Sequence, residues 1–190
     1  MKLVGKIALV TGAGQGMGRA IARRFAEEGA TVVALDLNLD NALATLDGIG
    51  EPSGAMALNV ADSKAVAETF ASIVQRFGRI DILVNNAGIG SVDSFADISD
   101  ETWARVTGVN LDGAFYCARE AVRAMQKAAA PGVIVNVAST AAVSGDGPAH
   151  YVASKAALIG LTRSMAKELA PQGIRVNTLV PGPTNTPMMQ

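Results

Sequence analysis

Cysteine and histidine are nearly absent, and each scarcity excludes a kind of site. The only cysteine, Cys117, cannot form a disulfide within the chain, which is compatible with a reducing compartment. We interpret it as a small buried hydrophobic residue. The only histidine, His150, has no cysteine or carboxylate partner at metal-ligand spacing, so we expect no metal site. We expect His150 at the start of a helix or at the rim of a cleft.

An excess of charge and long apolar runs are also missing. Sixteen basic residues oppose 17 acidic ones, and no basic run is long enough to attract nucleic acid or anionic lipid. No apolar stretch approaches the roughly 18 residues that span a bilayer. We expect no signal peptide at the N-terminus, because Gly5 and Lys6 interrupt its apolar run. We therefore expect a cytoplasmic protein with neither nucleic acid nor membrane as a partner.

Apolar runs of strand length alternate with longer helical patterns along the chain. The strands are continuously apolar and rich in β-branched residues, which is typical of parallel strands buried on both faces; we expect them at 6–10, 31–35, 55–58, 80–84, 132–137 and 175–179. The expected helices span 17–28, 39–46, 63–76, 100–127 and 151–170. Gly29, Gly78 and Gly173 lie where these helices are expected to end. Residues 139–148 are predicted to form a loop.

This alternation predicts one α/β domain over residues 1–190, with a doubly wound parallel sheet of order 3-2-1-4-5-6. Ligands of such sheets bind at the carboxyl ends of the strands, near the switch between the first and fourth strands. The chain ends at Gln190, soon after the sixth strand. We therefore expect the sheet to be truncated before a last strand.

A glycine-rich turn, Thr11–Gly18, joins the first strand to the first helix. Glycines let the backbone approach a pyrophosphate, and the helix N-terminus offers it free N–H groups and partial positive charge. A tight structural turn is the alternative, but the position between strand and helix favours a Rossmann-type nucleotide site. Asp36 ends the second strand, where a carboxylate binds ribose hydroxyls and repels a 2′-phosphate. Because Gln15 and Leu37 supply no cation for that phosphate, we expect NAD rather than NADP.

Further motifs follow the strands in a fixed order. They are Gly12, Gly16 and Gly18 in a TGxxxGxG spacing, Asn85-Asn86-Ala87-Gly88, Asn110, Ser139, Tyr151-Val-Ala-Ser-Lys155 and Pro181-Gly182. These motifs and their order extend along the whole chain, and through them the chain resembles the short-chain dehydrogenase/reductase family. The resemblance implies a catalytic domain that binds a nicotinamide dinucleotide and acts on a small alcohol or carbonyl compound.

The resemblance also implies which residues contact the cofactor. Asn86 and Gly88 would line the floor of the cleft near the adenosine, although a polar loop whose amides tie strands together stays open. Asn59 stands where the family usually has aspartate, and its amide can still accept a bond from the adenine. The segment from Pro181 to Thr186 would close over the nicotinamide, with a surface loop as the alternative. The expected cofactor residues are Gly12, Gln15, Gly16, Met17, Gly18, Asp36, Leu37, Asn59, Val60, Asn86, Ala87, Gly88, Tyr151, Lys155, Pro181, Gly182, Thr184 and Thr186.

The expected catalytic residues are Asn110, Ser139, Tyr151 and Lys155. Tyr151 and Lys155 are four residues apart and share one face of a helix, where an ammonium can stabilise a phenolate. Taken alone, a tyrosine and a lysine at this spacing usually lie on the exposed surface of a helix. The resemblance to the family implies that the tyrosine exchanges a proton with the substrate oxygen while hydride moves to or from NAD.

The resemblance gives the other catalytic residues supporting roles. Lys155 would also bind the hydroxyls of the nicotinamide ribose, and Ser139 would hydrogen-bond the substrate oxygen and orient it. Asn110 would hold a water that links Lys155 to solvent. Turn formation by Ser139 and local backbone bonding by Asn110 are the alternatives. Ser139 stands one residue closer to Tyr151 than the family pattern, so Thr140 could share its role.

The sequence thus predicts an NAD(H)-dependent oxidoreductase that interconverts a secondary alcohol and a ketone. An inactive fragment or a non-catalytic dinucleotide-binding protein is the alternative, because family members continue into a substrate lid and a last strand. A methyltransferase would explain neither Tyr151 with Lys155 nor Pro181-Gly182. We expect a homo-oligomer, a dimer or tetramer, formed through the two long alanine-rich helices. Loops set specificity in this fold, so the sequence leaves the substrate open. Met188 and Met189 could face the substrate, with a mobile terminal segment as the alternative.

Overall fold

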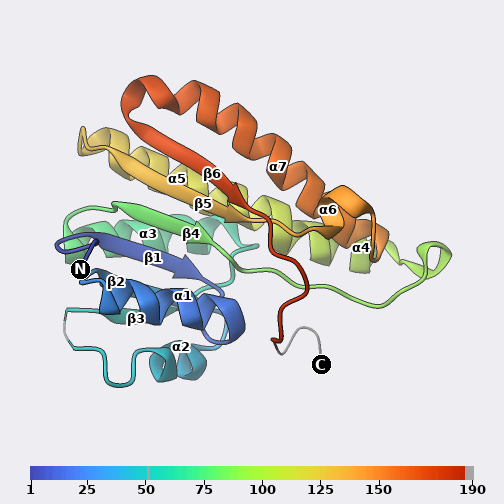
Figure 1. The fold of residues 1–190 in the computed structure, drawn as a ribbon, viewed down its shortest axis with the longest axis horizontal. Coiled ribbons are helices and arrows are strands. Elements are labelled where there is room, and N and C mark those ends of the chain that lie inside the picture. Colours follow the sequence, from blue (N-terminus) through green and yellow to red (C-terminus); the bar gives the residue numbers. More distant parts are fainter. Residues whose placement is uncertain (51, 187–190) are drawn as a thin grey trace.

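The computed structural model describes residues 1–50 and 52–186, so Met188 and Met189 lie outside the described residues. Its strands form one parallel sheet in the predicted order β3-β2-β1-β4-β5-β6 (Figure 1). Each strand begins and ends within two residues of the prediction. The strands are β1 (Ile7–Thr11), β2 (Thr31–Asp36), β3 (Gly54–Ala57), β4 (Ile82–Asn85), β5 (Gly132–Val137) and β6 (Ile174–Leu179).

Helices cover both faces of the sheet. α1 (Gly16–Glu27) and α2 (Leu39–Thr45) pack on one face, around Ala8, Val10 and Val32. α3 (Ser63–Phe77), α5 (Gly113–Lys127) and the end of α7 (Ala149–Leu169) pack on the other face, around Leu9 and Ile134. Successive residues of β1 thus serve opposite cores, which explains why the strands are continuously apolar.

Two expected elements differ from the structure. The helix expected at 100–127 is divided into α4 (Asp100–Thr107), the π-helical turn η2 (Gly108–Asp112) and α5. The loop expected at 139–148 contains a short helix, α6 (Ala141–Ser144), so that prediction was wrong there. The Ala-Ala-Val-Ser sequence has no helix breaker, and Gly145 ends the helix in the left-handed conformation. Short turns η1 (Phe95–Asp97) and η3 (Ala170–Gln172) complete the described elements.

The N-termini of the helices differ in whether a side chain caps them, and α1 is one of those without a cap. Asn38, Asp62 and Ser99 cap α2, α3 and α4 by accepting backbone N–H groups of the first turn. α1 has no such bond from Gln15 and no acidic residue in its first turn. Its free N–H groups point to the carboxyl end of the sheet, where a phosphate group would be stabilised.

Cys117 is fully buried in the core on the α3 and α5 face, as predicted. Burial raises the pKa of its thiol to about 12, so it is inert as a nucleophile near neutral pH. Within residues 1–50 and 52–186, no helix combines the length and apolar character needed to cross a membrane.

Candidate functional site

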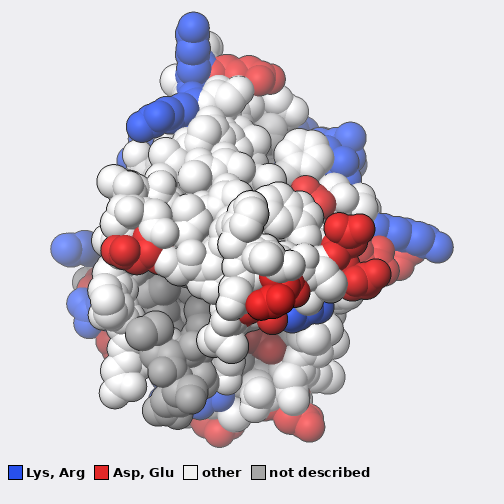
Figure 2. Space-filling view, turned by 90° about the vertical axis from the view of Figure 1, so that its right-hand side faces the viewer, with Lys and Arg blue, Asp and Glu red and all other residues white. Residues whose placement is uncertain are grey.

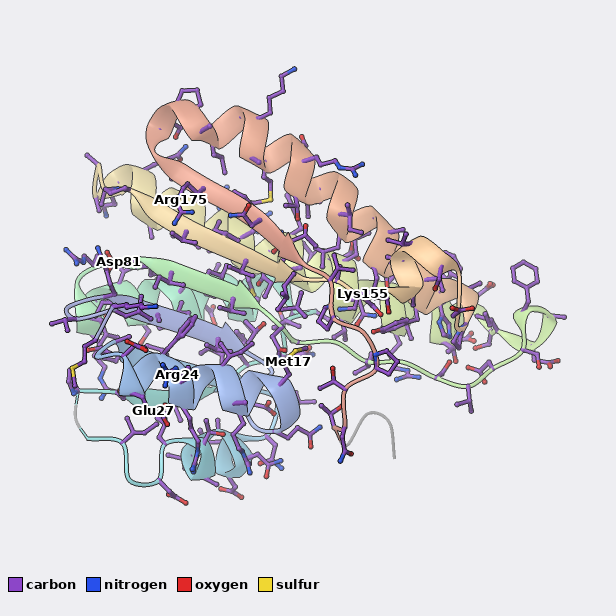
Figure 3. All side chains as sticks on the ribbon, in the orientation of Figure 1. Met17, Arg24, Glu27, Asp81, Lys155 and Arg175 are labelled. Carbon is purple, nitrogen blue, oxygen red and sulfur yellow. The ribbon has the colours of Figure 1, made fainter. Side chains whose placement is uncertain are left out.

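A cleft of about 750 Å³ opens at the carboxyl end of the sheet. It lies between the turn that follows β1, the loops after β4 and β5, and the start of α7. Met17 on α1 and Lys155 on α7 both lie at this end of the molecule (Figure 3). Every residue expected at the cofactor lines the cleft, as do Ser139, Tyr151 and Lys155. Asn110 does not line it.

The glycine turn is shaped by close backbone contacts. Gly12 has a φ of +62°, and a Cβ there would lie 2.8 Å from the Ala87 Cα. A Cβ on Gly18 would overlap the carbonyl oxygen of Gly12. Side chains at these positions would therefore push the turn away from the loop after β4. Their absence leaves backbone N–H groups and the open end of α1 beside the cleft, a cradle suited to a pyrophosphate.

Asp36 is fixed at the edge of this cradle. Its Oδ2 accepts the Gly14 N–H at 2.7 Å, and its Oδ1 accepts the Asn38 N–H at 3.0 Å. A carboxylate has further lone pairs that can accept ribose hydroxyls. Of the described residues that line the cleft, only Asp36, Asp146 and Lys155 carry charge. Arg19 is near in sequence, but its guanidinium contacts the Gly14 and Asn41 carbonyl oxygens.

The Asn86 side chain ties two strands together. Its Nδ2 donates to the carbonyl oxygens of Thr11 and Gly12 at 3.0 and 3.1 Å. The Thr11 hydroxyl in turn accepts the N–H groups of Asn86 and Ala87. The strand-tying alternative therefore describes the Asn86 amide, while Gly88 and Ala87 form the cleft floor.

Two outer segments complete the cofactor side of the cleft. Beyond β3, the Oδ1 of Asn59 accepts the Ala61 N–H at 3.1 Å, so this oxygen is already partly engaged. On the opposite side, the Thr140 N–H donates to the Pro181 carbonyl oxygen at 2.9 Å. This bond anchors the segment after β6 next to Ser139, and Thr184 continues the wall of the cleft.

Tyr151 and Lys155 lie on the face of α7 that borders the cleft. Lys155 is 4% exposed, and its Nζ donates to the Val137 carbonyl oxygen at 2.8 Å. The same Nζ lies 5.8 Å from the centre of the Tyr151 ring. Burial lowers the pKa of Lys155 to about 8, so the side chain is mainly an ammonium at pH 7. A buried cation beside a phenol in a cleft is the arrangement expected of an acid–base pair.

Asn110 is buried behind this pair, in the π-helical turn. Its Oδ1 accepts the Ile89 N–H at 2.8 Å, and its Nδ2 donates to the Ile89 carbonyl oxygen and to Ser154 Oγ. The structure therefore matches the alternative, an amide bonded to backbone, and a water-holding role for Asn110 stays a prediction. A Cβ on Gly88 would lie 3.2 Å from Lys155 Nζ and 3.3 Å from Asn110 Oδ1, so this packing is tight.

Ser139 keeps its place in the cleft despite the short spacing to Tyr151. Its Oγ accepts the Ala141 N–H at 3.2 Å, which leaves the hydroxyl hydrogen free to donate. Thr140 also lines the cleft but is more exposed. The turn-forming and orienting roles of Ser139 are therefore compatible.

Sequence reasoning missed a second polar pair. His150 is the second residue of α7, in agreement with the predicted position at a helix start, and it is fully buried rather than at the rim of the cleft. The helix cap, Pro148, makes no side-chain bond, and His150 Nδ1 accepts the Tyr151 N–H instead. Its Nε2 lies 2.6 Å from Oγ of Ser91, a residue that lines the cleft. No sequence signal connects these residues, because they are 59 positions apart.

The chain matches the short chain dehydrogenase family over residues 6–190 and belongs to that family of oxidoreductases. It is 43% identical to 3-oxoacyl-(acyl-carrier-protein) reductase FabG of Thermotoga maritima, covering 100% of this chain and 78% of the relative. It is 42% identical to a 3beta-hydroxysteroid dehydrogenase of Mediterraneibacter gnavus, covering 97% and 68%.

A solved structure of 3-ketoacyl-(acyl-carrier-protein) reductase from Brucella melitensis, complexed with NADH, superposes on this chain with a TM-score of 0.93. The two share 37% identity over 98% of this chain and 79% of the other. These names differ in substrate while the fold is shared, so they establish the family without fixing what this chain acts on.

Proposed function

We propose that the protein is an NAD(H)-dependent oxidoreductase that interconverts a secondary alcohol and a ketone. The observation that carries this proposal is the meeting of Tyr151, Lys155 and Ser139 in one cleft with the glycine cradle. The cradle fits a dinucleotide because Gly12 and Gly18 let the turn pack closely against the loop after β4, which leaves the uncapped N-terminus of α1 beside the cleft. When bound there, the nicotinamide would supply or accept the hydride.

The protein's own groups would handle the proton. Tyr151 would take the proton from the alcohol oxygen, or return it to the ketone oxygen, as general base or acid. The Lys155 ammonium, whose Nζ lies 5.8 Å from the centre of the Tyr151 ring, would stabilise the phenolate. Ser139 would donate its hydroxyl hydrogen to the substrate oxygen and fix its direction. The Val137 carbonyl oxygen holds Lys155 in this position.

Asp36 supports NAD over NADP. Its carboxylate stands where the adenosine ribose would lie, and a 2′-phosphate would meet this negative charge. Among the described cleft residues the only cation is Lys155. Its Nζ donates to the Val137 carbonyl oxygen and lies near Tyr151, so it would not bind a 2′-phosphate at the adenosine ribose. The likeness to an NADH complex agrees with this preference.

A second candidate is the reduction of 3-oxoacyl thioesters, which the names of two relatives favour. A substrate delivered on a carrier protein needs a docking surface around the cleft. Figure 2 looks onto this end of the molecule, where acidic side chains lie across the middle and most basic ones at the margin. An anionic carrier would be repelled there, so we favour a small free substrate.

The test is a screen of the purified protein with secondary alcohols, their ketones and acetoacetyl thioesters, each with both nicotinamide dinucleotides. We expect turnover of alcohols and ketones with a clear preference for NAD(H). Preference for the thioester with NADPH would support the second candidate. Tight NADH binding without turnover of any compound would support a non-catalytic dinucleotide-binding protein.

We also propose a homo-oligomer that assembles through α4, α5 and α7. Trp103 on α4 and Phe115 on α5 are 44% and 42% exposed. The Arg119 guanidinium lies 5.3 Å from the Phe115 ring centre, which makes this surface partly apolar and partly cationic. Sedimentation as a monomer at micromolar concentration would contradict the proposal. The cytoplasmic location stays a prediction.

A further inference from the structure

Ser91 presents a second hydroxyl to the cleft. It lies in the loop after β4 and lines the same cleft as Tyr151 and Ser139. The loop runs beside the tyrosine, because a Cβ on Gly90 would lie 3.8 Å from Tyr151 Cδ2. Ser91 Oγ is 2.6 Å from Nε2 of the fully buried His150. Within residues 1–50 and 52–186 it has no other hydrogen-bond partner.

The contacts of His150 determine which way the Ser91 hydroxyl points. The Tyr151 N–H donates to Nδ1 at 2.7 Å, so Nδ1 carries the lone pair. In a neutral imidazole the hydrogen then stands on Nε2. The nearest carboxylate oxygen, Asp93 Oδ2, is 3.8 Å from Nε2 and too far for a hydrogen bond. Nε2–H therefore donates to Ser91 Oγ, and the Ser91 hydroxyl hydrogen is left to point into the cleft.

We propose that Ser91 is a substrate-recognition residue and that His150 is the positioning residue that sets the direction of its hydroxyl. Its ligand is a second oxygen atom on the substrate, besides the oxygen that exchanges a proton with Tyr151. The favoured substrates are therefore hydroxyketones, diols or oxoesters rather than simple ketones or alcohols. This inference rests on the proposed function, because it names the substrate class of the same cleft.

The kinetic test compares probes of matched chain length that differ by one hydroxyl in the first pair and by an ester group, with its two oxygens, in the second. With NADH, the pairs are acetoin with 2-butanone and ethyl acetoacetate with 2-heptanone. We expect the wild type to favour the oxygen-bearing member of at least one pair by tenfold or more in kcat/KM. Ser91→Ala should reduce this preference about tenfold, through a larger loss of kcat/KM on the oxygen-bearing member than on the simple ketone, and Ser91→Thr should restore it. Ser164→Ala, at an exposed position of α7, is the matched control.

Two kinetic results would overturn the inference. One is a wild type without preference in either pair. The other is a Ser91→Ala variant that loses equal activity on both members of a pair, since that would indicate a merely structural residue. Reduction of simple ketones with either result would leave the proposed function standing, so the two failures can be told apart.

A measurement without turnover tests the positioning role. Because His150 is the only histidine, protein labelled with ¹⁵N-histidine gives a single imidazole pattern in an NMR spectrum. We expect hydrogen on Nε2 and none on Nδ1 at neutral pH, and an altered Nε2 signal in Ser91→Ala. Hydrogen on Nδ1 would reverse the direction of the Ser91 hydroxyl and refute the proposal, even for a protein that reduces none of the probes.

Discussion

Lys155 allows a quantitative prediction of how the free energy of unfolding depends on pH. Burial of its ammonium disfavours folding, while the charge is needed to stabilise the Tyr151 phenolate. Burial lowers the pKa of Lys155 from 10.5 to about 8. Between these values the unfolded chain holds a proton that the folded chain has lost, so stability rises with pH. From pH 7 to pH 10, at about 1.36 kcal/mol per unit, the wild type should gain roughly 2–3 kcal/mol from this group.

Lys155→Met removes this titration and keeps most of the side-chain volume. The free energy of unfolding of both proteins is measured in urea at pH 7 and pH 10. We expect the wild type to gain roughly 2–3 kcal/mol relative to the variant, or roughly 5–10 °C in Tm for a chain of this size. Lys167→Met, at an exposed position of the same helix, controls for general alkaline effects. Parallel pH dependence of wild type and Lys155→Met would refute the reasoning.

Three further predictions concern the cradle and the core. Asp36→Ala should reduce the preference for NAD(H) over NADP(H) at least tenfold in kcat/KM; an unchanged ratio would show that Asp36 does not select the cofactor. Gly18→Ala should weaken NADH binding at least tenfold in a fluorescence titration, whereas Gly160→Ala, with open space at its Cβ, should not. Asn136→Leu should cost about 1–3 kcal/mol in urea unfolding, since it leaves polar groups that bond to the buried Asn136 without that partner; no loss would contradict this.

The sheet and the cradle could be predicted because local patterns determine them. Continuously apolar strands alternate with helices, and this combination admits few topologies. The glycines of Thr11–Gly18 and the carboxylate of Asp36 stand at positions that a dinucleotide requires. The cofactor side of the cleft follows, because the strand order brings the carboxyl ends of β1, β2 and β4 together.

The remaining features depend on contacts between distant parts of the chain. The π-helical turn at Asn110 shifts the hydrogen-bond ladder by one residue, which leaves no mark on the apolar periodicity. The spacing of Tyr151 and Lys155 placed them on one face, but only the packing of α7 shows that the lysine is buried. His150 and Ser91 meet only because the loop after β4 folds over the start of α7.

The central claim is that the Tyr151 phenol exchanges a proton with the substrate beside a bound nicotinamide. The most direct measurement is the kcat of Tyr151→Phe on the best substrate of the screen, with NADH affinity determined in parallel. We predict a loss of about 10²-fold or more in kcat, with NADH affinity kept within a few-fold. Turnover at the wild-type rate in a variant that binds NADH normally would contradict the account.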